Sequence, residues 1–185
     1  MRKFLSISLL ITHLFSFEVA NAVGLNGAVA SSKEEASQIG IDILKKGGNA
    51  IDAAVSVAFA LAVTHPSAGN IGGGGFMVIR LANGAVTTID FREKAPLLST
   101  KDMFLDENGD VIQNKSRYTS WASGVPGTVD GLGYAHDKYG SMPWDLLLYP
   151  AINLAKYGFN LDYHNILLLN SDRYKYLLSN DSESI

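Results

Sequence analysis

A glycine run near the centre of the chain separates an apolar helix from a pair of strands. Residues 53–63 are apolar almost all round, which is typical of a helix buried on most sides. The His65-Pro66 pair ends this helix, because the residue before a proline avoids the α region. Glycines occupy 72–75, and the strand-like segments that follow are 76–81 and 85–91, joined by an Asn83-Gly84 turn. The pattern predicts a buried helix that leads into a β-hairpin, with Arg92 at the end of the second strand.

Helix-start and helix-stop signals predict further helices on both sides of this segment. Ser32 followed by Glu35 has the capping-box pattern, and an apolar stripe at helical spacing then runs to Gly47. Asn49 and Asp52 give the start signal of the apolar helix. The other helices are expected over residues 126–139, 143–158 and 163–178.

A polar, turn-rich stretch occupies residues 93–120, and we expect a loop with a small hairpin there. Its turn is predicted at Asp106–Asp110, where alternating carboxylates resemble the start of a calcium loop. The glycine comes too early for that motif and no closing glutamate follows. An ordinary turn is therefore the better interpretation.

The composition describes one domain with a sizeable core and no cysteine chemistry. The chain has 185 residues, of which 47% are hydrophobic, and no internal repeat. Its 15 basic and 18 acidic side chains give a net charge of −3 without a basic cluster, so nucleic acid is an unlikely partner. The absence of cysteine excludes disulfides, a thiol nucleophile and a thiolate metal site.

Residues 1–22 have the three parts of a signal peptide. Arg2 and Lys3 give the charged start, an apolar stretch follows, and Ala20-Asn21-Ala22 is the small-residue cleavage pattern. We expect cleavage after Ala22, no stable membrane anchor after cleavage, and a periplasmic or secreted product; an uncleaved anchor is the alternative.

Several patterns that could carry chemistry lack a necessary part. No Gly-Lys-Ser/Thr follows the glycine run, which leads into a strand and so does not form a phosphate cradle. The glycines instead suit close backbone packing or a tight site wall. His65 and His136 each stand alone, so no metal site is expected. Ser123 precedes the glycine that a nucleophile elbow would require it to follow.

Arg92 is the one candidate binding residue, within Asp90-Phe91-Arg92-Glu93. The local sequence leaves two interpretations open. Arg92 forms a surface ion pair at a strand end, or its guanidinium fork holds a substrate carboxylate.

Seven motifs together resemble the start of the large subunit of γ-glutamyltranspeptidases. They lie in the order and spacing of that family over about residues 24–160. The motifs are DILKKGGNAIDAA at 42–54, AVTHP at 62–66, GNIGGGGFM at 69–77, IDFREKAP at 89–96, DMFLD at 102–106, ASGVPGTV at 122–129 and DKYG at 137–140.

The resemblance implies an α+β fold, the four-layer αββα sandwich of N-terminal-nucleophile hydrolases, with residues 23–185 forming part of the large-subunit domain. In that family a precursor cuts itself, and the new N-terminal threonine of the small subunit attacks the γ-glutamyl amide of glutathione, with its own amine as base. The γ-glutamyl group then passes to water or to an amino-acid or peptide acceptor. The family's carboxylate-binding arginine matches Arg92, and no cofactor or metal is implied.

The nucleophilic threonine of the family has no counterpart in this chain, whose last threonine is Thr128 in a large-subunit motif. We therefore expect no catalytic residue here and no activity from the chain alone. The expected partners are glutathione or other γ-glutamyl compounds and a small subunit from the same precursor. The polar stretch toward Ile185 suggests a truncated gene, a frameshift or a partial record. Two alternatives stay open: a glutaryl-type acylase of the same fold, and a non-catalytic secreted remnant.

Overall fold

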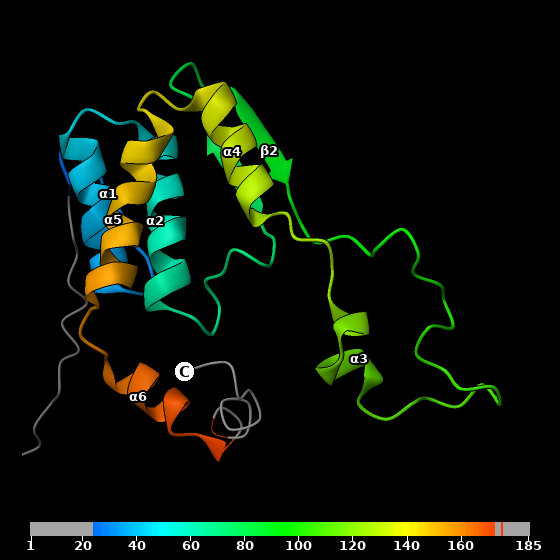
Figure 1. Ribbon diagram of the computed structural model, residues 1–185. Helices are drawn as coiled ribbons and strands as arrows, with labels where there is room; N and C mark the ends of the chain where they lie inside the picture. The colour runs from blue at the N-terminus through cyan, green and yellow to red at the C-terminus, as the bar shows by residue number, and fades with distance from the viewer. Residues whose placement is uncertain (1–23, 173–174, 176–185) are drawn as a thin grey trace, which may run out of the picture.

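A computed structural model describes residues 24–172 and residue 175, and it places a helical bundle beside a two-stranded sheet (Figure 1). The signal peptide predicted at residues 1–22 lies outside the described part. None of the described helices is long and apolar enough to cross a membrane. The elements are α1 Glu34–Lys45, α2 Ala50–Thr64, β1 Phe76–Arg80, β2 Val86–Asp90, α3 Lys115–Tyr118, a 3₁₀ turn Ser120–Ala122, α4 Thr128–Tyr139, α5 Trp144–Tyr157 and α6 Tyr163–Leu169.

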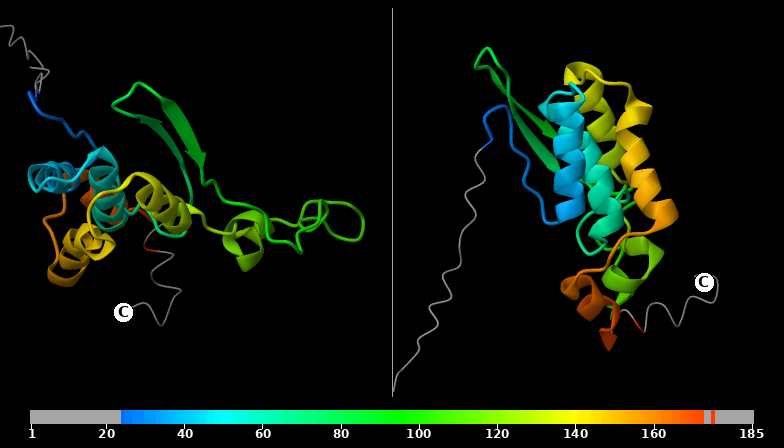
Figure 2. Two further views of the ribbon diagram at one scale, coloured as in Figure 1. Left: turned by 90° about the horizontal axis from the view of Figure 1, so that it is seen from above. Right: turned by 90° about the vertical axis from the view of Figure 1, so that its left-hand side faces the viewer.

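Helix α2 is the centre of the bundle, as its apolar sequence predicts. It packs against α1, α4 and α5, and Figure 2 shows α1, α2 and α5 side by side. The predicted start signal is confirmed, because the Asn49 side chain accepts from the N–H groups of Ile51 and Asp52 at 2.8 and 3.1 Å. Val55, Phe59 and other buried apolar side chains of α2 form the core with residues of the neighbouring elements, which include Ile43, Ile79, Leu132 and Leu147.

The start of α1 differs from the sequence prediction. The N-cap is Lys33, in an extended conformation, and its side chain makes no capping bond, so the capping box predicted for Ser32 and Glu35 is wrong. The nearby serine that forms hydrogen bonds is Ser31, whose hydroxyl donates to the Lys33 carbonyl oxygen at 2.8 Å and lies 2.8 Å from the Ser37 hydroxyl. The chain therefore enters the helix one residue later than predicted.

A buried carboxylate ties the start of α2 to the loop between α4 and α5. Asp52 is fully buried and accepts hydrogen bonds from the N–H groups of Asn49 at 2.8 Å and Ser141 at 2.9 Å, and from the Ser141 hydroxyl. Burial by itself raises the pKa of Asp52, but the hydrogen bonds from Ser141, Asn49 and Met142 outweigh burial and hold the pKa below its usual value. The charged form of Asp52 is thus the form that the fold stabilises.

The predicted hairpin is confirmed, with β1 and β2 antiparallel and Gly84 in the turn at φ 87°. Because successive strand residues face opposite sides, Ile79 is buried and Met77 and Ile89 pack on the core. The other face exposes three apolar side chains, Phe76, Val78 and Val86. One face of this small sheet is therefore covered by helix and the other is open.

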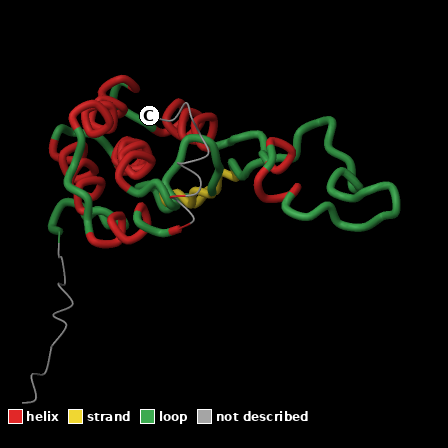
Figure 3. Tube along the Cα trace, turned by 60° about the horizontal axis from the view of Figure 1, so that its bottom comes forward, coloured by secondary structure: helices red, strands yellow, loops and turns green. Residues whose placement is uncertain are grey.

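Residues 95–124 leave the body as an extended segment, which we call the arm (Figure 3). Lys94 and Val125 pair at its base, with N–H to carbonyl distances of 3.2 and 2.8 Å. The turn predicted at Asp106–Asp110 is confirmed, flanked by a bridge between Leu105 and Val111. The short helix α3, which the sequence analysis did not predict, lies in the arm.

The last three helices agree with the predicted order and differ at their ends. Helix α4 begins at Thr128, two residues after Pro126. Helix α5 begins after Pro143 and ends before Gly158, whose φ is 81°, so the bracketing of this helix by Pro143 and Gly158 is confirmed. Helix α6 ends at Leu169, earlier than the predicted 178, although most residues after 172 lie outside the described part.

Candidate substrate-binding site

Arg92 lies two residues beyond β2, at the strand end that the sequence predicts. Its side chain is exposed, and its backbone N–H donates to the Asp90 carboxylate at 3.0 Å. The preceding residue, Phe91, continues the strand pairing with Gly75: the Phe91 N–H donates to the Gly75 carbonyl oxygen at 3.0 Å. The backbone that carries Arg92 is therefore fixed by the hairpin.

Four glycines pack tightly against Phe91, and we call Gly74, Gly75, Gly127 and Gly131 the glycine bed; a Cβ atom on Gly75 would lie 2.9 Å from the Phe91 ring. A Cβ atom on Gly127 would lie 2.0 Å from the Phe91 carbonyl oxygen, and one on Gly131 would lie 2.1 Å from Cγ of the Phe91 ring. A Cβ atom on Gly74 would lie 2.5 Å from the same carbonyl oxygen. Any larger residue would displace Phe91, so the close packing expected of the glycine run is confirmed.

The glycine run also anchors the start of α4. The Gly73 carbonyl oxygen accepts from the N–H groups of Gly127 at 2.7 Å and Thr128 at 3.0 Å. The Thr128 hydroxyl lies 3.3 Å from the Asn70 side-chain oxygen. These bonds join the glycine run, the strand end and α4 into one unit around Phe91 and Arg92.

Two hollows meet at Arg92. The first, of about 500 Å³, lies between the end of β2 and α4, and its wall includes Arg92, Asp130 and Tyr134. The second, of about 600 Å³, lies toward the arm, and Arg92 shares its wall with Phe104 and Trp121. Both volumes fall in the range of small-molecule sites.

The guanidinium of Arg92 has no ion-pair partner among the described residues. The surface ion pair proposed from local sequence is therefore not present in this part of the chain. Such an exposed guanidinium on the wall of a hollow can bind a carboxylate by donating two parallel hydrogen bonds to it. The arrangement can thus bind an anionic group.

Within the described residues, no three His, Asp or Glu side chains gather closely enough to hold a metal ion. His136 Nε2 lies 2.7 Å from the Met142 carbonyl oxygen, and the ring centroids of His136 and Trp144 are 5.2 Å apart. His136 therefore contributes to packing and hydrogen bonding within the bundle. His65 lies at the end of α2, and its ring centroid is 6.2 Å from that of His164. Neither histidine lines a hollow with Arg92.

The sequence analysis missed the role of Gly131, which lies inside α4. A glycine within a helix costs about 1 kcal/mol relative to alanine, so Gly131 is a candidate for a packing role, but Gly133 of the same helix gives the same signal and meets open space. The residue that requires the space is Phe91, about forty positions earlier in the sequence, which a local pattern does not reveal.

Solved structures of known proteins share this fold over most of the chain. The crystal structure of Helicobacter pylori γ-glutamyltranspeptidase matches 85% of this chain with a TM-score of 0.81 and 49% identity, and the match covers 45% of that structure's chain. A cephalosporin acylase from Bacillus halodurans matches 79% of this chain with a TM-score of 0.66 and 29% identity, covering 27% of its own chain. The described residues are thus part of the α+β fold of the N-terminal-nucleophile hydrolases.

Sequence comparison narrows this class to one family. The family model described as gamma-glutamyltranspeptidase matches residues 36–183. A glutathione hydrolase proenzyme of Escherichia coli K12 is 59% identical over 133 residues, which are 72% of this chain and 23% of that protein. The chain belongs to the γ-glutamyltranspeptidase family, and it spans about a quarter of the length of the curated relatives that it matches.

Proposed function

We propose that this chain is the carboxylate-binding part of a glutathione hydrolase, and that Arg92 holds the α-carboxylate of the γ-glutamyl group. The observation that carries the proposal is the Arg92 guanidinium, which has no ion-pair partner among the described residues and lies beside two hollows on a backbone held by the glycine bed. A bidentate pair would fix the substrate carboxylate and so the position of the γ-carbonyl carbon. The names of the relatives support glutathione as the substrate.

The chemistry of the proposal requires a second part of the protein. The family resemblance assigns the nucleophile to a threonine at the N-terminus of a small subunit, made by cleavage of a precursor. Its hydroxyl would attack the γ-glutamyl carbonyl and expel the amine, and the acyl group would pass to water or to an amino-acid or peptide acceptor. The proenzyme names of the relatives support such a precursor. We propose no cofactor and no catalytic residue for this chain, which is inactive alone.

The proposed enzyme acts outside the inner membrane. The support is the signal-peptide pattern of residues 1–22. Fusion of these residues to a reporter enzyme that folds only after export would test it, because an Arg2→Glu, Lys3→Glu variant should retain the reporter in the cytoplasm.

A test of the binding role measures release from a chromogenic γ-glutamyl anilide. The chain from residue 23 is assayed alone and mixed with a separately expressed small subunit of a relative. We expect activity only in the mixture, and Arg92→Ala should lower kcat/KM about 100-fold because a charged bidentate contact is lost. Arg92→Lys keeps the charge without the fork and should recover only part of the activity.

The matched control is Arg80→Ala, which removes an exposed arginine at the opposite end of the hairpin. It should leave kcat/KM unchanged. Activity from the chain alone would contradict the absence of a nucleophile. An Arg92→Ala mixture as active as the unsubstituted one would reject Arg92 as the carboxylate-binding residue. No detectable release of the anilide in any mixture would favour a non-catalytic secreted remnant.

The second candidate is a glutaryl-type acylase of the same fold, and the similarity to a cephalosporin acylase favours it. Both enzymes would use an arginine for the terminal carboxylate. Because a glutaryl anilide lacks the α-amino group, comparing it with the γ-glutamyl anilide separates the two functions. Faster release from the glutaryl compound would support the acylase.

A further inference from the structure

Helix α6 is attached to the bundle with little apolar packing. Tyr163, Ile166, Leu167 and Leu169 are exposed, Leu168 is partly buried, and none of them packs against the buried apolar cluster. The helix lies beyond the end of the bundle in Figure 1. The hydrophobic effect therefore contributes little to its position. Its attachment must come from other contacts.

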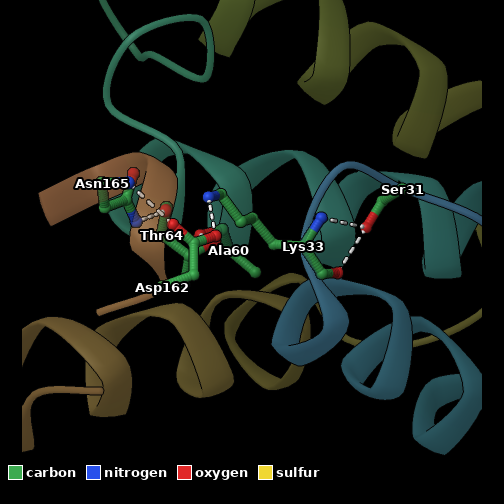
Figure 4. Close-up of polar contacts among 6 residues, drawn as sticks. All are labelled: Ser31, Lys33, Ala60, Thr64, Asp162 and Asn165. Carbon is green, nitrogen blue, oxygen red and sulfur yellow. Dashed lines mark hydrogen bonds and ion pairs between the residues drawn. The ribbon is translucent and has the colours of Figure 1, made fainter. Parts of the chain in front are cut away.

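The first of these contacts is an ion pair across 129 positions of the sequence. The Lys33 ammonium, at the start of α1, donates to the carboxylate of Asp162, at the start of α6 (Figure 4). The Lys33 side chain is only 6% exposed, whereas Asp162 is half-exposed. A lysine so buried is costly without a partner, so loss of Asp162 would leave Lys33 unpaired.

The second contact joins α6 to the end of α2. The Asn165 side chain, 2% exposed, donates from Nδ2 to the Thr64 carbonyl oxygen at 2.9 Å (Figure 4). Thr64 ends α2, where the carbonyl groups lack a partner within the helix. The Thr64 hydroxyl itself donates to the Ala60 carbonyl oxygen at 3.0 Å. The bond from Asn165 thus satisfies one buried donor and one helix-end acceptor at once.

The two contacts are coupled through Asp162. Its second carboxylate oxygen accepts from the Asn165 N–H at 2.7 Å, which caps α6 and sets the direction of Asn165. A movement of Asp162 would break the cap of α6 and the ion pair with Lys33. It would also shift Asn165, whose side chain bonds the Thr64 carbonyl oxygen. The three contacts are therefore expected to form and break together.

We propose that Lys33, Asp162, Asn165 and Thr64 form a polar latch that holds α6 on the ends of α1 and α2 and that opens as one unit without unfolding the bundle. The bundle keeps its own apolar core when the latch is open, because no side chain of α6 belongs to the buried apolar cluster.

Acid provides a way to open the latch. The hydrogen bond from Lys33, followed by the cap bond from Asn165, holds the pKa of Asp162 below its usual value of 3.8. The groups that face Asp162 are Lys33 from α1 and His164 from α6, and His65 at the end of α2 lies beside His164. Because the folded-state pKa is depressed, the stabilisation is present above pH 3.8 and is lost as pH falls through the lower folded value.

Hydrogen exchange of backbone amides in the full 185-residue chain tests the latch, with α2 as the internal reference. Lys33→Met keeps the length of the side chain and removes its charge. We expect the amides of α6 to exchange about tenfold faster in this variant, with the exchange of α2 unchanged. Asp162→Ser keeps a good N-cap and removes the ion partner, and it should have the same effect.

The matched control is Lys46→Met, at the other end of α1, where the side chain is exposed. It should leave α6 unchanged. Unaltered exchange of α6 in Lys33→Met would overturn the latch, as would fast exchange of α6 in the unsubstituted chain. Faster exchange of α2 together with α6 would show that Lys33 supports the whole bundle and would also overturn it. An effect of Lys33→Met without one of Asp162→Ser would assign Lys33 to packing.

Discussion

The bundle and the arm belong to one chain but are held by different forces. In the bundle, Val55, Leu147 and Ala60 are fully buried, and polar groups such as Asp52 are buried with their hydrogen bonds made. In the arm, none of residues 95–124 is buried, and Leu97 and Leu98 are almost fully exposed. Burial of apolar side chains therefore stabilises the bundle, whereas the arm is held by the backbone pairing at its base and by hydrogen bonds in its local turns.

This difference indicates that the bundle has a hydrophobic core of its own and that the arm does not. A segment without a core loses conformational entropy on ordering and gains little hydrophobic burial in return. The exposed apolar side chains of the arm and of the open face of the hairpin mark surfaces that are suited to contact with a further part of the protein. Substitutions in the bundle and in the arm should therefore differ sharply in their effect on stability.

The largest effect is expected in the core of the bundle. Leu147→Ala removes a fully buried side chain and should lower the free energy of unfolding by about 2–5 kcal/mol. Urea unfolding followed by circular dichroism measures it. The neighbouring Leu146 is 50% exposed on the same helix, so Leu146→Ala is the control and should cost less than about 1 kcal/mol. Equal costs for the two would contradict the assigned burial of α5.

The next effect concerns the buried carboxylate of Asp52. Asp52→Asn removes the charge that several donors surround, and should cost about 2–3 kcal/mol at pH 7. Because the folded pKa is below the usual 3.8, this stabilisation is present above that pH and is lost as pH falls toward the folded value. Urea midpoints from pH 7 to pH 3 should fall less steeply in Asp52→Asn. Asp137→Asn, at an exposed position, should retain the original slope.

A smaller effect tests the glycine bed, which connects the bundle to Arg92. Gly131→Ala places a Cβ atom against the Phe91 ring and should destabilise the chain by about 1–3 kcal/mol. Gly133→Ala, in the same helix, meets open space and should be neutral or stabilising by up to about 1 kcal/mol. Thermal unfolding of the two variants measures the contrast. Stabilisation by both alanines would show that Phe91 is not tightly held.

The smallest effect is expected in the arm. Trp121 is 57% exposed and contacts Lys115, whose ammonium lies 4.9 Å from the ring centroid. Trp121→Ala should change the free energy of unfolding by less than about 0.5 kcal/mol. Trp144→Ala is the comparison in the bundle, where the ring packs edge-on against Phe59 at 5.6 Å, and it should cost several times more. An equal loss of unfolding free energy in Trp121→Ala and Trp144→Ala would show that the arm contributes to stability as much as the bundle does.

Local signals predicted the elements around residues 49–91 well. The cap at Asn49, the stop at His65 and the Asn83-Gly84 turn each depend on neighbours in sequence, and each is confirmed. The capping box predicted at Ser32 failed because the N-cap residue is Lys33, whose side chain makes no capping bond. Local patterns thus identify elements more reliably than their first residues.

The candidate site was only partly predictable. The hairpin pattern predicted that Arg92 lies at a strand end. Only the structure could show that Arg92 forms no ion pair within the described part of the chain. The contact between Gly131 and Phe91 and the pair of Lys33 with Asp162 join residues far apart in sequence. Such contacts depend on how elements pack, which periodicity does not specify.

The pairing of Lys94 with Val125 brings together the two ends of the arm next to Arg92. The entropy of closing a flexible loop grows slowly, by about 0.6 kcal/mol for each doubling of its length. With its ends joined in this way, the arm can gain or lose residues in evolution at small cost. A change in the length of the arm therefore need not move Arg92, because the pairing of Lys94 with Val125 closes the arm two residues beyond the arginine.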